Sequence, residues 1–436
     1  MSKTKPLSDK ALTQTISKLY KQESSRLLGV LTRIFGTHNF SLAEDVLQDA
    51  FAKAWHEWQD KGIPANPAAW LLTTAKHQAI DVIRNQKMKI KFADDLAYHL
   101  ESEWTLGATI EDAFQAPKIK DDQLRMLFMC CHESIKPENG IPFMLKALCG
   151  FSIPAIARAL VVPEETIKKR LQRTRKKIST LSFAMPKAHE LHQALATVHT
   201  VLYLLFNEGF HCSSDKQSVR LEFCQDAIAL VKLLVDEPSI ANQETLGLFA
   251  LMHFHIARID SKLSHDGQNI PIDLQDRKLW TQAYIQTGNQ LISYANKLTP
   301  HNQGRFYLEA CIAQEHCNAT SFEATDWENI ITLYDKLIAT NDSPIAKLNQ
   351  SIAVAYAGDT NKAIAQAKAL QQNNLLKKSH MPWAVLAHLH AKNNNTEEAY
   401  RCLEKAKALG GTPQEQLLML QQVERILQGK TIAKRQ

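Results

Sequence analysis

Two runs of basic side chains are the residues in this sequence best suited to chemistry with a partner. One run contains seven cations: Lys168, Lys169, Arg170, Arg173, Arg175, Lys176 and Lys177. The other contains Arg84, Lys87, Lys89 and Lys91. Each phosphate that such a side chain neutralises releases counterions, so two separate patches suit a polyanion that touches the protein at two places. A solvated helix face would carry the same charges, and the flanking sequence must decide between the two.

The charge is distributed unevenly along the chain. The chain has 436 residues with 51 Lys and Arg against 45 Asp and Glu. Residues 1–183 hold 27 basic and 20 acidic side chains, whereas residues 184–436 hold 24 and 25. The basic excess is therefore entirely N-terminal.

Composition predicts an all-α protein. Gly and Pro number only 15 each, while the good helix formers Ala, Leu, Lys and Gln are abundant. No apolar run approaches the roughly 18 to 20 residues that span a bilayer, and the first 15 residues are polar, so we expect a cytoplasmic protein without a membrane segment. The eight cysteines form no CxxC pair and are expected to be reduced core residues.

The N-terminal part divides into helices and a tether. Apolar periodicity predicts one helix over residues 12–35, and Ser41 with Glu44 has the spacing of a capping box that opens a second helix over residues 42–58. Residues 60–67 read as a loop and residues 68–87 as a third helix. Residues 92–120 are acidic with little apolar repeat, which predicts a tether between domains.

Residues 152–178 have the pattern of a helix-turn-helix. A short helix over residues 153–160 is followed by a tight connection, and Pro163 lies at the start of a second helix whose first turn contains Glu164 and Glu165. Ile167, Leu171 and Ile178 are expected to face inward, which leaves a basic outer face. A helix of this kind fits the width of the major groove, although many helical hairpins are merely structural.

Taken together, these segments resemble the conserved parts of a bacterial sigma-70 family factor of the extracytoplasmic-function type. The resemblance rests on residues 43–55 (AEDVLQDAFAKAW), residues 69–84 (AWLLTTAKHQAIDVIR), and the helix-turn-helix segments 150–163 (GFSIPAIARALVVP) and 166–178 (TIKKRLQRTRKKI). It covers roughly residues 15–182.

The resemblance implies a role for each segment. The helix over residues 42–58 would bind core RNA polymerase, with Asp45, Gln48 and Asp49 as polar contacts and Phe51 and Trp55 as packing residues. The loop at residues 61–66 and the helix after it would bind the unwound minus-ten strand of promoter DNA through Trp70, Lys76, Arg84, Lys87 and Lys89. The second domain would bind the minus-thirty-five duplex through Thr166, Lys169, Arg170, Arg173 and Lys177.

Two places depart from the family pattern. The family often has Arg-Asn where this chain has Lys76-His77. The stretch over residues 126–139 contains Cys130-Cys131-His132, but adjacent cysteines cannot easily ligate one ion, so we expect core packing there and predict no metal or cofactor.

The C-terminal part contains a repeat. Its best copy has the offsets of a tetratricopeptide hairpin, formed by Trp383, Leu386, Ala387, His390, Ala399, Leu403 and Ala406. Ala363 lies 36 residues before Ala399 in a comparable context, and a helix over residues 327–339 reads as the end of an earlier copy. We expect a stacked solenoid.

The expected domains are a sigma region 2 domain (10–92), an acidic linker (93–120), a sigma region 4 helix-turn-helix (121–182), a helical extension (183–298) and tetratricopeptide-like repeats (299–430). The resemblance implies a non-enzymatic sigma factor. We expect its C-terminal segment to regulate it by contacting the sigma domains, with an unknown protein partner for the repeats. The alternative is a helix-turn-helix regulator that binds DNA without polymerase and uses the repeats as a partner platform. A metal-dependent hydrolase using Glu208, His253 and His255 is a third interpretation.

Overall fold

The protein is built from helices. The computed structural model describes residues 9–86, 103–160, 162–211, 220–264, 269–298, 303–411 and 413–433. Within these ranges every regular element is a helix, and the only strand-like pairing is an isolated antiparallel bridge between Leu263 and Asn269. The all-α prediction is confirmed. Among the described helices, none has the length and apolar character needed to cross a bilayer.

The chain forms two compact units. The first comprises residues 1–208 and 225–233, and the second comprises residues 209–224 and 234–436. The division falls inside the segment expected to be a separate helical extension, because most of α10 (Ala188–Phe210) and most of α11 (Leu221–Val235) belong to the first unit.

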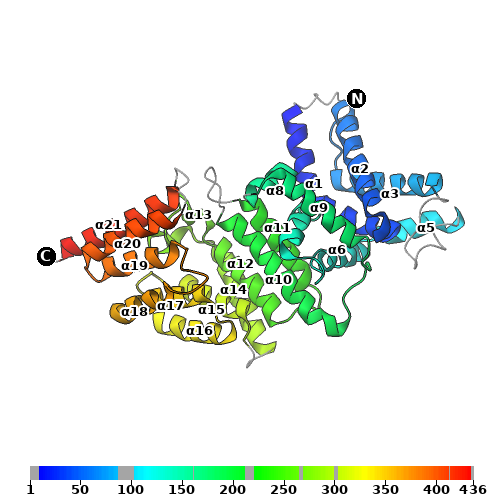
Figure 1. Ribbon diagram of the computed structural model, residues 1–436. Coiled ribbons are helices and arrows are strands. Elements are labelled where there is room, and N and C mark those ends of the chain that lie inside the picture. Colours follow the sequence, from blue (N-terminus) through cyan, green and yellow to red (C-terminus); the bar gives the residue numbers. More distant parts are fainter. Residues whose placement is uncertain are drawn as a thin grey trace. The chain divides into compact units, whose positions relative to one another are not determined.

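The first unit begins with a three-helix bundle (Figure 1). Its elements are α1 (Asp9–Phe35), the short 3-10 helix η1 (Thr37–Asn39), α2 (Phe40–Lys61) and α3 (Pro67–Gln86). Gly36 and Gly62 adopt positive φ angles of 77° and 80° where α1 and α2 end, a conformation that other residues rarely adopt. The predicted helices are therefore confirmed, with small differences at their ends.

The capping-box prediction is wrong. α2 begins at Phe40, two residues earlier than the capping box requires, and its N-cap Asn39 makes no side-chain cap hydrogen bond. Ser41 is consequently exposed on the first turn, and the carboxylate of Glu44 bonds to another helix, as described below.

Part of the expected tether is helical. Its first residues lie outside the described ranges, but α5 (Glu103–Ala113) and the start of α6 (Ala116–Cys130) occupy residues 103–120. Leu106, Ile110 and Phe114 are buried at a spacing of four residues, which is an apolar stripe too sparse to stand out among the acidic side chains. Residues 103–120 are therefore largely helical, which the sequence did not predict.

A buried carboxylate joins α6 to α1. Asp122 is fully buried, and its Oδ1 accepts a 3.0 Å hydrogen bond from Arg125 and lies 4.0 Å from Nη1 of Arg33. The backbone of α6 approaches closely here, because a Cβ at Gly29 would lie 3.0 Å from the carbonyl carbon and oxygen of Asp122. Burial raises the pKa of Asp122 from 3.8 to about 7 against the opposing effect of the two arginines.

The first unit continues with the helix-turn-helix, which is confirmed. Its elements are α7 (Pro137–Ala147), α8 (Ile153–Ala159) and α9 (Glu164–Ile178). Cys130 and Cys131, which end α6 and begin the connection to α7, are buried as expected for core residues.

The second unit is a series of packed helices that ends in hairpins, coloured yellow to red in Figure 1. It contains α12 (Gln243–Ile256), α13 (Ile259–Lys262), η2 (Ile272–Leu274), η3 (Arg277–Leu279), α14 (Gln282–Leu298), α15 (Arg305–Asn318), α16 (Trp327–Thr340), α17 (Pro344–Tyr356), α18 (Thr360–Leu370), α19 (Met381–Lys392), α20 (Thr396–Leu409) and α21 (Pro413–Ala433). Consecutive helices from α15 to α20 pack against one another. The predicted hairpin corresponds to α19 and α20, and its small residues Ala387, Ala399 and Ala406 are at most 1% exposed.

A cavity of about 350 Å³ lies within the second unit. Aromatic rings form one wall, where Trp327 stacks on Tyr356 with ring centroids 4.8 Å apart and Phe322 meets both rings edge-on. An ion pair between Asp273 and Arg425 lies at its edge.

Replacing Asp122 should remove a pH dependence of stability. Between pH 4 and 7 the folded chain binds the Asp122 proton more tightly than the unfolded chain. The contribution of this residue to the free energy of unfolding therefore falls as pH rises, by up to about 1.4 kcal/mol per pH unit. Denaturant unfolding of Asp122→Asn across this range should show a shallower decline than the wild type. The exposed neighbour provides the control: if Asp121→Asn flattens the profile equally, the buried carboxylate is not the cause.

Candidate nucleic-acid interface

The helix-turn-helix positions its second helix by local capping. The Ser152 side chain accepts a 3.3 Å hydrogen bond from the backbone N–H of Ala155 at the start of α8, and the N–H of Val162 donates to the carbonyl of Ala157 at its end. Pro163 then serves as the N-cap of α9, and two glutamates occupy the first turn, where the helix dipole favours negative charge. These contacts fix where α9 begins and hence which of its faces is exposed.

An apolar stripe fixes the rotation of α9. Ile167, Leu171 and Ile178 are at most 1% exposed, and α7 and α8 both pack against α9. Thr174 completes the buried face, and its hydroxyl donates a 2.9 Å hydrogen bond to the carbonyl of Arg170. The opposite face is therefore the one available to a partner.

Three exposed cations form a ridge on that face of α9. Lys169, Arg173 and Lys177 follow one another at intervals of four residues, which places them in a row over about 12 Å of helix. Within the described part of the chain none of the three forms a salt bridge. The other two predicted contacts, Thr166 and Arg170, are half-buried at the edges of the ridge. We call Lys169, Arg173 and Lys177 the α9 ridge.

The predicted DNA contacts on α3 differ from one another in exposure and in pairing. Trp70 is half-buried and meets Trp58 edge-on with ring centroids 5.3 Å apart, whereas Arg84 is exposed. Lys76 forms a salt bridge with Glu111 of α5, so this cation is already neutralised in the present arrangement. Lys87 and Lys89 lie outside the described residues.

The predicted polymerase contacts all lie on α2, but some are exposed and others are buried. Asp45, Gln48 and Asp49 are exposed at spacings of three and four residues and lie on one face. Phe51 is 6% exposed and packs edge-on against Tyr20 at 4.7 Å, so its ring belongs to the core of the bundle. Trp55 is half-buried.

A contact that the sequence did not predict joins α2 to α9. Arg175 donates two hydrogen bonds to the carboxylate of Glu44, at 2.7 Å from Nε and 2.8 Å from Nη2. The fork of the guanidinium matches the two carboxylate oxygens, which makes this a strong and directional ion pair. Nearby, Phe40 meets Phe143 with ring centroids 5.6 Å apart, and the Thr37 hydroxyl donates to the carbonyl of Leu181 at 2.8 Å. Phe143 lies on α7, Thr37 in η1 and Leu181 just after α9. We call these three contacts together the α2–α9 junction.

Helical spacing separates Arg175 from the rest of the basic run. Arg175 follows Leu171 by four residues and precedes Ile178 by three, so its side chain lies beside the buried stripe. The α9 ridge lies on the other side of the helix. This signal was present in the sequence, but its partner Glu44 is 131 residues away and could not be found from local pattern.

The fold and the charged surface define a class: a helical protein that contains a helix-turn-helix whose second helix has a basic outer face. Comparison with known proteins gives the family. A sigma-70 region 2 model matches residues 19–88, a sigma-70 region 4 model matches residues 125–178, and a family of unknown function (DUF6596) matches residues 194–296. Uncharacterized protein R00370 of Rhizobium meliloti (strain 1021) is 30% identical over 347 residues, which cover 79% of this chain and 80% of that protein. The chain belongs to the sigma-70 family, as a factor like those of the extracytoplasmic-function type with an additional C-terminal domain.

No solved structure matches this chain. The region 2 match covers most of α1 and all of α2 and α3, the region 4 match covers the end of α6 and all of α7 to α9, and α5 lies between them.

Removing one cation from the α9 ridge should weaken binding to duplex DNA in a salt-dependent way. If Arg173 neutralises one phosphate, Arg173→Ala should reduce the slope of log affinity against log salt concentration by about one unit. The measurement is fluorescence anisotropy with labelled duplex over a range of salt concentrations.

Lys168→Ala is the matched control for this experiment. It removes the same charge from the same helix, but Lys168 already pairs with Glu165 at 2.6 Å. We expect a much smaller change in slope. Equal changes in both variants would mean that net charge, rather than the α9 ridge, governs binding.

Proposed function

We propose that this protein binds core RNA polymerase and directs it to a specific set of promoters. The α9 ridge supports the proposal, because three cations without a salt bridge to any described residue stand in a row on the outer face of a helix-turn-helix that the sigma-70 region 4 model matches. The ridge would contact phosphates of the minus-thirty-five duplex, and half-buried Thr166 and Arg170 would lie close to base edges. Sequence selection then requires no catalysis, since each wrong base pair costs about 1–3 kcal/mol of binding free energy.

The first module would supply the other two surfaces. Trp70 and Arg84 on α3 would bind the opened minus-ten strand by stacking and phosphate contact. Asp45, Gln48 and Asp49 would bind polymerase, and their exposure on one face of α2 supports this assignment. Working with polymerase would place the protein in the cytoplasm.

The α2–α9 junction sets a condition on this function. The minus-ten and minus-thirty-five elements lie about 25 base pairs apart, which is about 85 Å of B-DNA at 3.4 Å per base pair. A compact body of roughly 200 residues has a radius of gyration of only about 16 Å. Both modules cannot reach both elements while Arg175 remains bonded to Glu44, so we infer that the junction opens on the promoter.

The regulatory role expected of the C-terminal segment remains a prediction, and the division into units affects its test. Deleting all residues after 183 would remove α10 and part of α11 from the first unit. Filling the cavity of the second unit in the full chain avoids this problem. Ala384→Leu at the cavity wall, compared with Ala369→Leu on the exposed face of α18, isolates the cavity's effect on transcription.

Run-off transcription with purified core polymerase tests the proposed function. The chain should start transcripts from particular genomic fragments, and Asp49→Arg should reduce capture of core polymerase by at least about tenfold, because it reverses a charge on the proposed surface. Duplex binding by Asp49→Arg should be unchanged. If the chain binds DNA but neither captures polymerase nor initiates transcription, it is a regulator that acts without polymerase.

Reversing one charge of the ion pair should open the junction, and reversing both charges should close it again. Arg175→Glu places two carboxylates against each other, whereas Glu44→Arg combined with Arg175→Glu restores an ion pair. Fluorescent labels at Gln48→Cys and Gln172→Cys, both exposed positions, report the distance between α2 and α9. Energy transfer should fall in the single variant and recover in the double variant. Unchanged transfer in all three proteins would show that the ion pair does not hold the modules together.

A further inference from the structure

The turn between α19 and α20 holds the end of one helix against the start of the next. Asn394 adopts a positive φ of 62°, and the backbone N–H of Asn395 donates a 2.9 Å hydrogen bond to the carbonyl of His390. The Asn395 side chain then caps α20 by accepting from the N–H of Glu398 at 3.2 Å. His390 is therefore fixed beside the first turns of α20.

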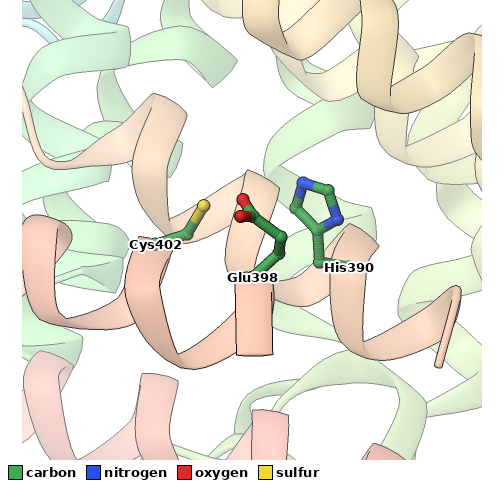
Figure 2. Close-up of side chains that lie close together, drawn as sticks. All are labelled: His390, Glu398 and Cys402. Carbon is green, nitrogen blue, oxygen red and sulfur yellow. The ribbon is translucent and has the colours of Figure 1, made fainter. Parts of the chain in front are cut away.

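Three side chains with metal-binding atoms meet at this place. A ring nitrogen of His390, a carboxylate oxygen of Glu398 and the sulfur of Cys402 all lie within 4.8 Å of one another. Glu398 and Cys402 are four residues apart on α20, so they share a face, and Figure 2 shows them beside His390 of α19. The three atoms come from one rigid hairpin rather than from mobile loops.

His390 lacks the partner that buried histidines normally have. It is 5% exposed, and both of its ring nitrogens are buried without a hydrogen-bond partner among the described residues. Other buried histidines of the second unit are satisfied: Nδ1 of His253 lies 2.7 Å from the Phe249 carbonyl, and Nε2 of His388 lies 3.1 Å from the Tyr356 hydroxyl. An unpaired buried imidazole indicates a group that is missing from its surroundings.

The surroundings keep this imidazole available as a ligand. Burial lowers the pKa of His390, and the positive charge of Lys368 lowers it further, so the ring is neutral at physiological pH. Neutral imidazole is the form that binds metal ions. Burial also raises the pKa of the Cys402 thiol, so this thiol is protonated in the absence of a cation.

We propose that His390, Glu398 and Cys402 bind a divalent cation of the zinc class. One nitrogen, one oxygen and one sulfur ligand suit Zn²⁺ or Co²⁺ and not the oxygen-seeking Mg²⁺ or Ca²⁺. Three protein ligands leave a fourth tetrahedral position for water. On binding, the Cys402 thiol loses its proton to solvent and the thiolate bonds to the cation, so one proton is released for each ion bound.

The charges around the cluster are compatible with this cation. Arg401 bonds to Oε2 of Glu398, which leaves Oε1 for the metal, and Lys368 of α18 and Lys405 of α20 also face the cluster. These cations weaken binding of a positive ion. The Glu398 carboxylate and the thiolate formed on binding offset that effect, because they are in direct contact with the metal.

Cobalt titration of the full chain tests the site. The protein is reduced, stripped of metal and titrated with Co²⁺, whose bond to a thiolate produces a charge-transfer absorption band. The wild type should develop this band with one equivalent of Co²⁺, and Zn²⁺ should displace it. Zn²⁺ should also raise the thermal unfolding midpoint, because it binds only the folded hairpin.

Substitutions of the three proposed ligands show where the cobalt binds. Cys402→Ser should abolish the band, and His390→Gln and Glu398→Gln should each weaken cobalt affinity by more than about tenfold, since even the loss of an outer partner of a metal ligand has that effect. Glu397→Gln is the matched control, because it removes an exposed carboxylate from the same turn of α20. Circular dichroism verifies that each variant is folded. If Cys402→Ser does not fold, the cobalt affinity of Glu398→Gln shows whether this cluster binds the ion.

Three outcomes would overturn the proposal. Absence of the band in the wild type excludes the site. A band that persists in folded Cys402→Ser assigns the cobalt to other cysteines of the chain. A band that weakens equally in Glu397→Gln and Glu398→Gln shows that Glu398 is not a ligand.

Discussion

The rotation of α9 about its own axis is the constraint on which the candidate interface depends. Ile167, Leu171 and Ile178 are buried, and because each residue advances by a fixed angle along the helix, their burial determines where every other side chain points. The same seven cations on a helix rotated by half a turn would present a different surface. The apolar neighbours therefore separate two parts of the basic run: the α9 ridge faces outward, whereas Arg175 bonds to Glu44.

That division gives one helix two roles that compete. The ridge suits a polyanion, while Arg175 ties the helix to α2, the same helix that exposes Asp45, Gln48 and Asp49. The junction uses a single ion pair, one aromatic contact and one hydrogen bond. Few interactions and partial exposure of the ion pair make this a contact that binding energy from DNA and polymerase can displace. Extensive packing between α1 and α6, by contrast, surrounds a buried carboxylate and resists separation.

The sequence predicted those parts of the fold whose causes are local. Apolar periodicity located α1, α2 and α3, and the Pro163 connection located α8 and α9, because helix ends and buried stripes are properties of neighbouring residues. The helical part of the tether was missed since Leu106, Ile110 and Phe114 form a stripe only one residue wide. Glu44 was misassigned to a capping box because its true partner is brought close only by the tertiary fold. For the candidate site, the exposure of Lys169, Arg173 and Lys177 followed from helical phase, whereas the pairing of Lys76 with Glu111 depended on where α5 packs.

Asp122 and His390 are both buried polar side chains, but the cost of burying them is offset in different ways. Asp122 has one oxygen without a hydrogen bond, but two arginines lie close to its other oxygen, and its protonation at moderate pH removes the cost of burying its charge. His390 is already neutral, so protonation chemistry offers no such relief, and its ring nitrogens still lack partners. A neutral imidazole gains from an electron-pair acceptor, and a thiol and a carboxylate lie at the distance where one ion could reach all three. The tetratricopeptide-like spacing that placed His390 in the core of the hairpin explains its burial, but it does not explain why a polar ring should occupy that position without a partner.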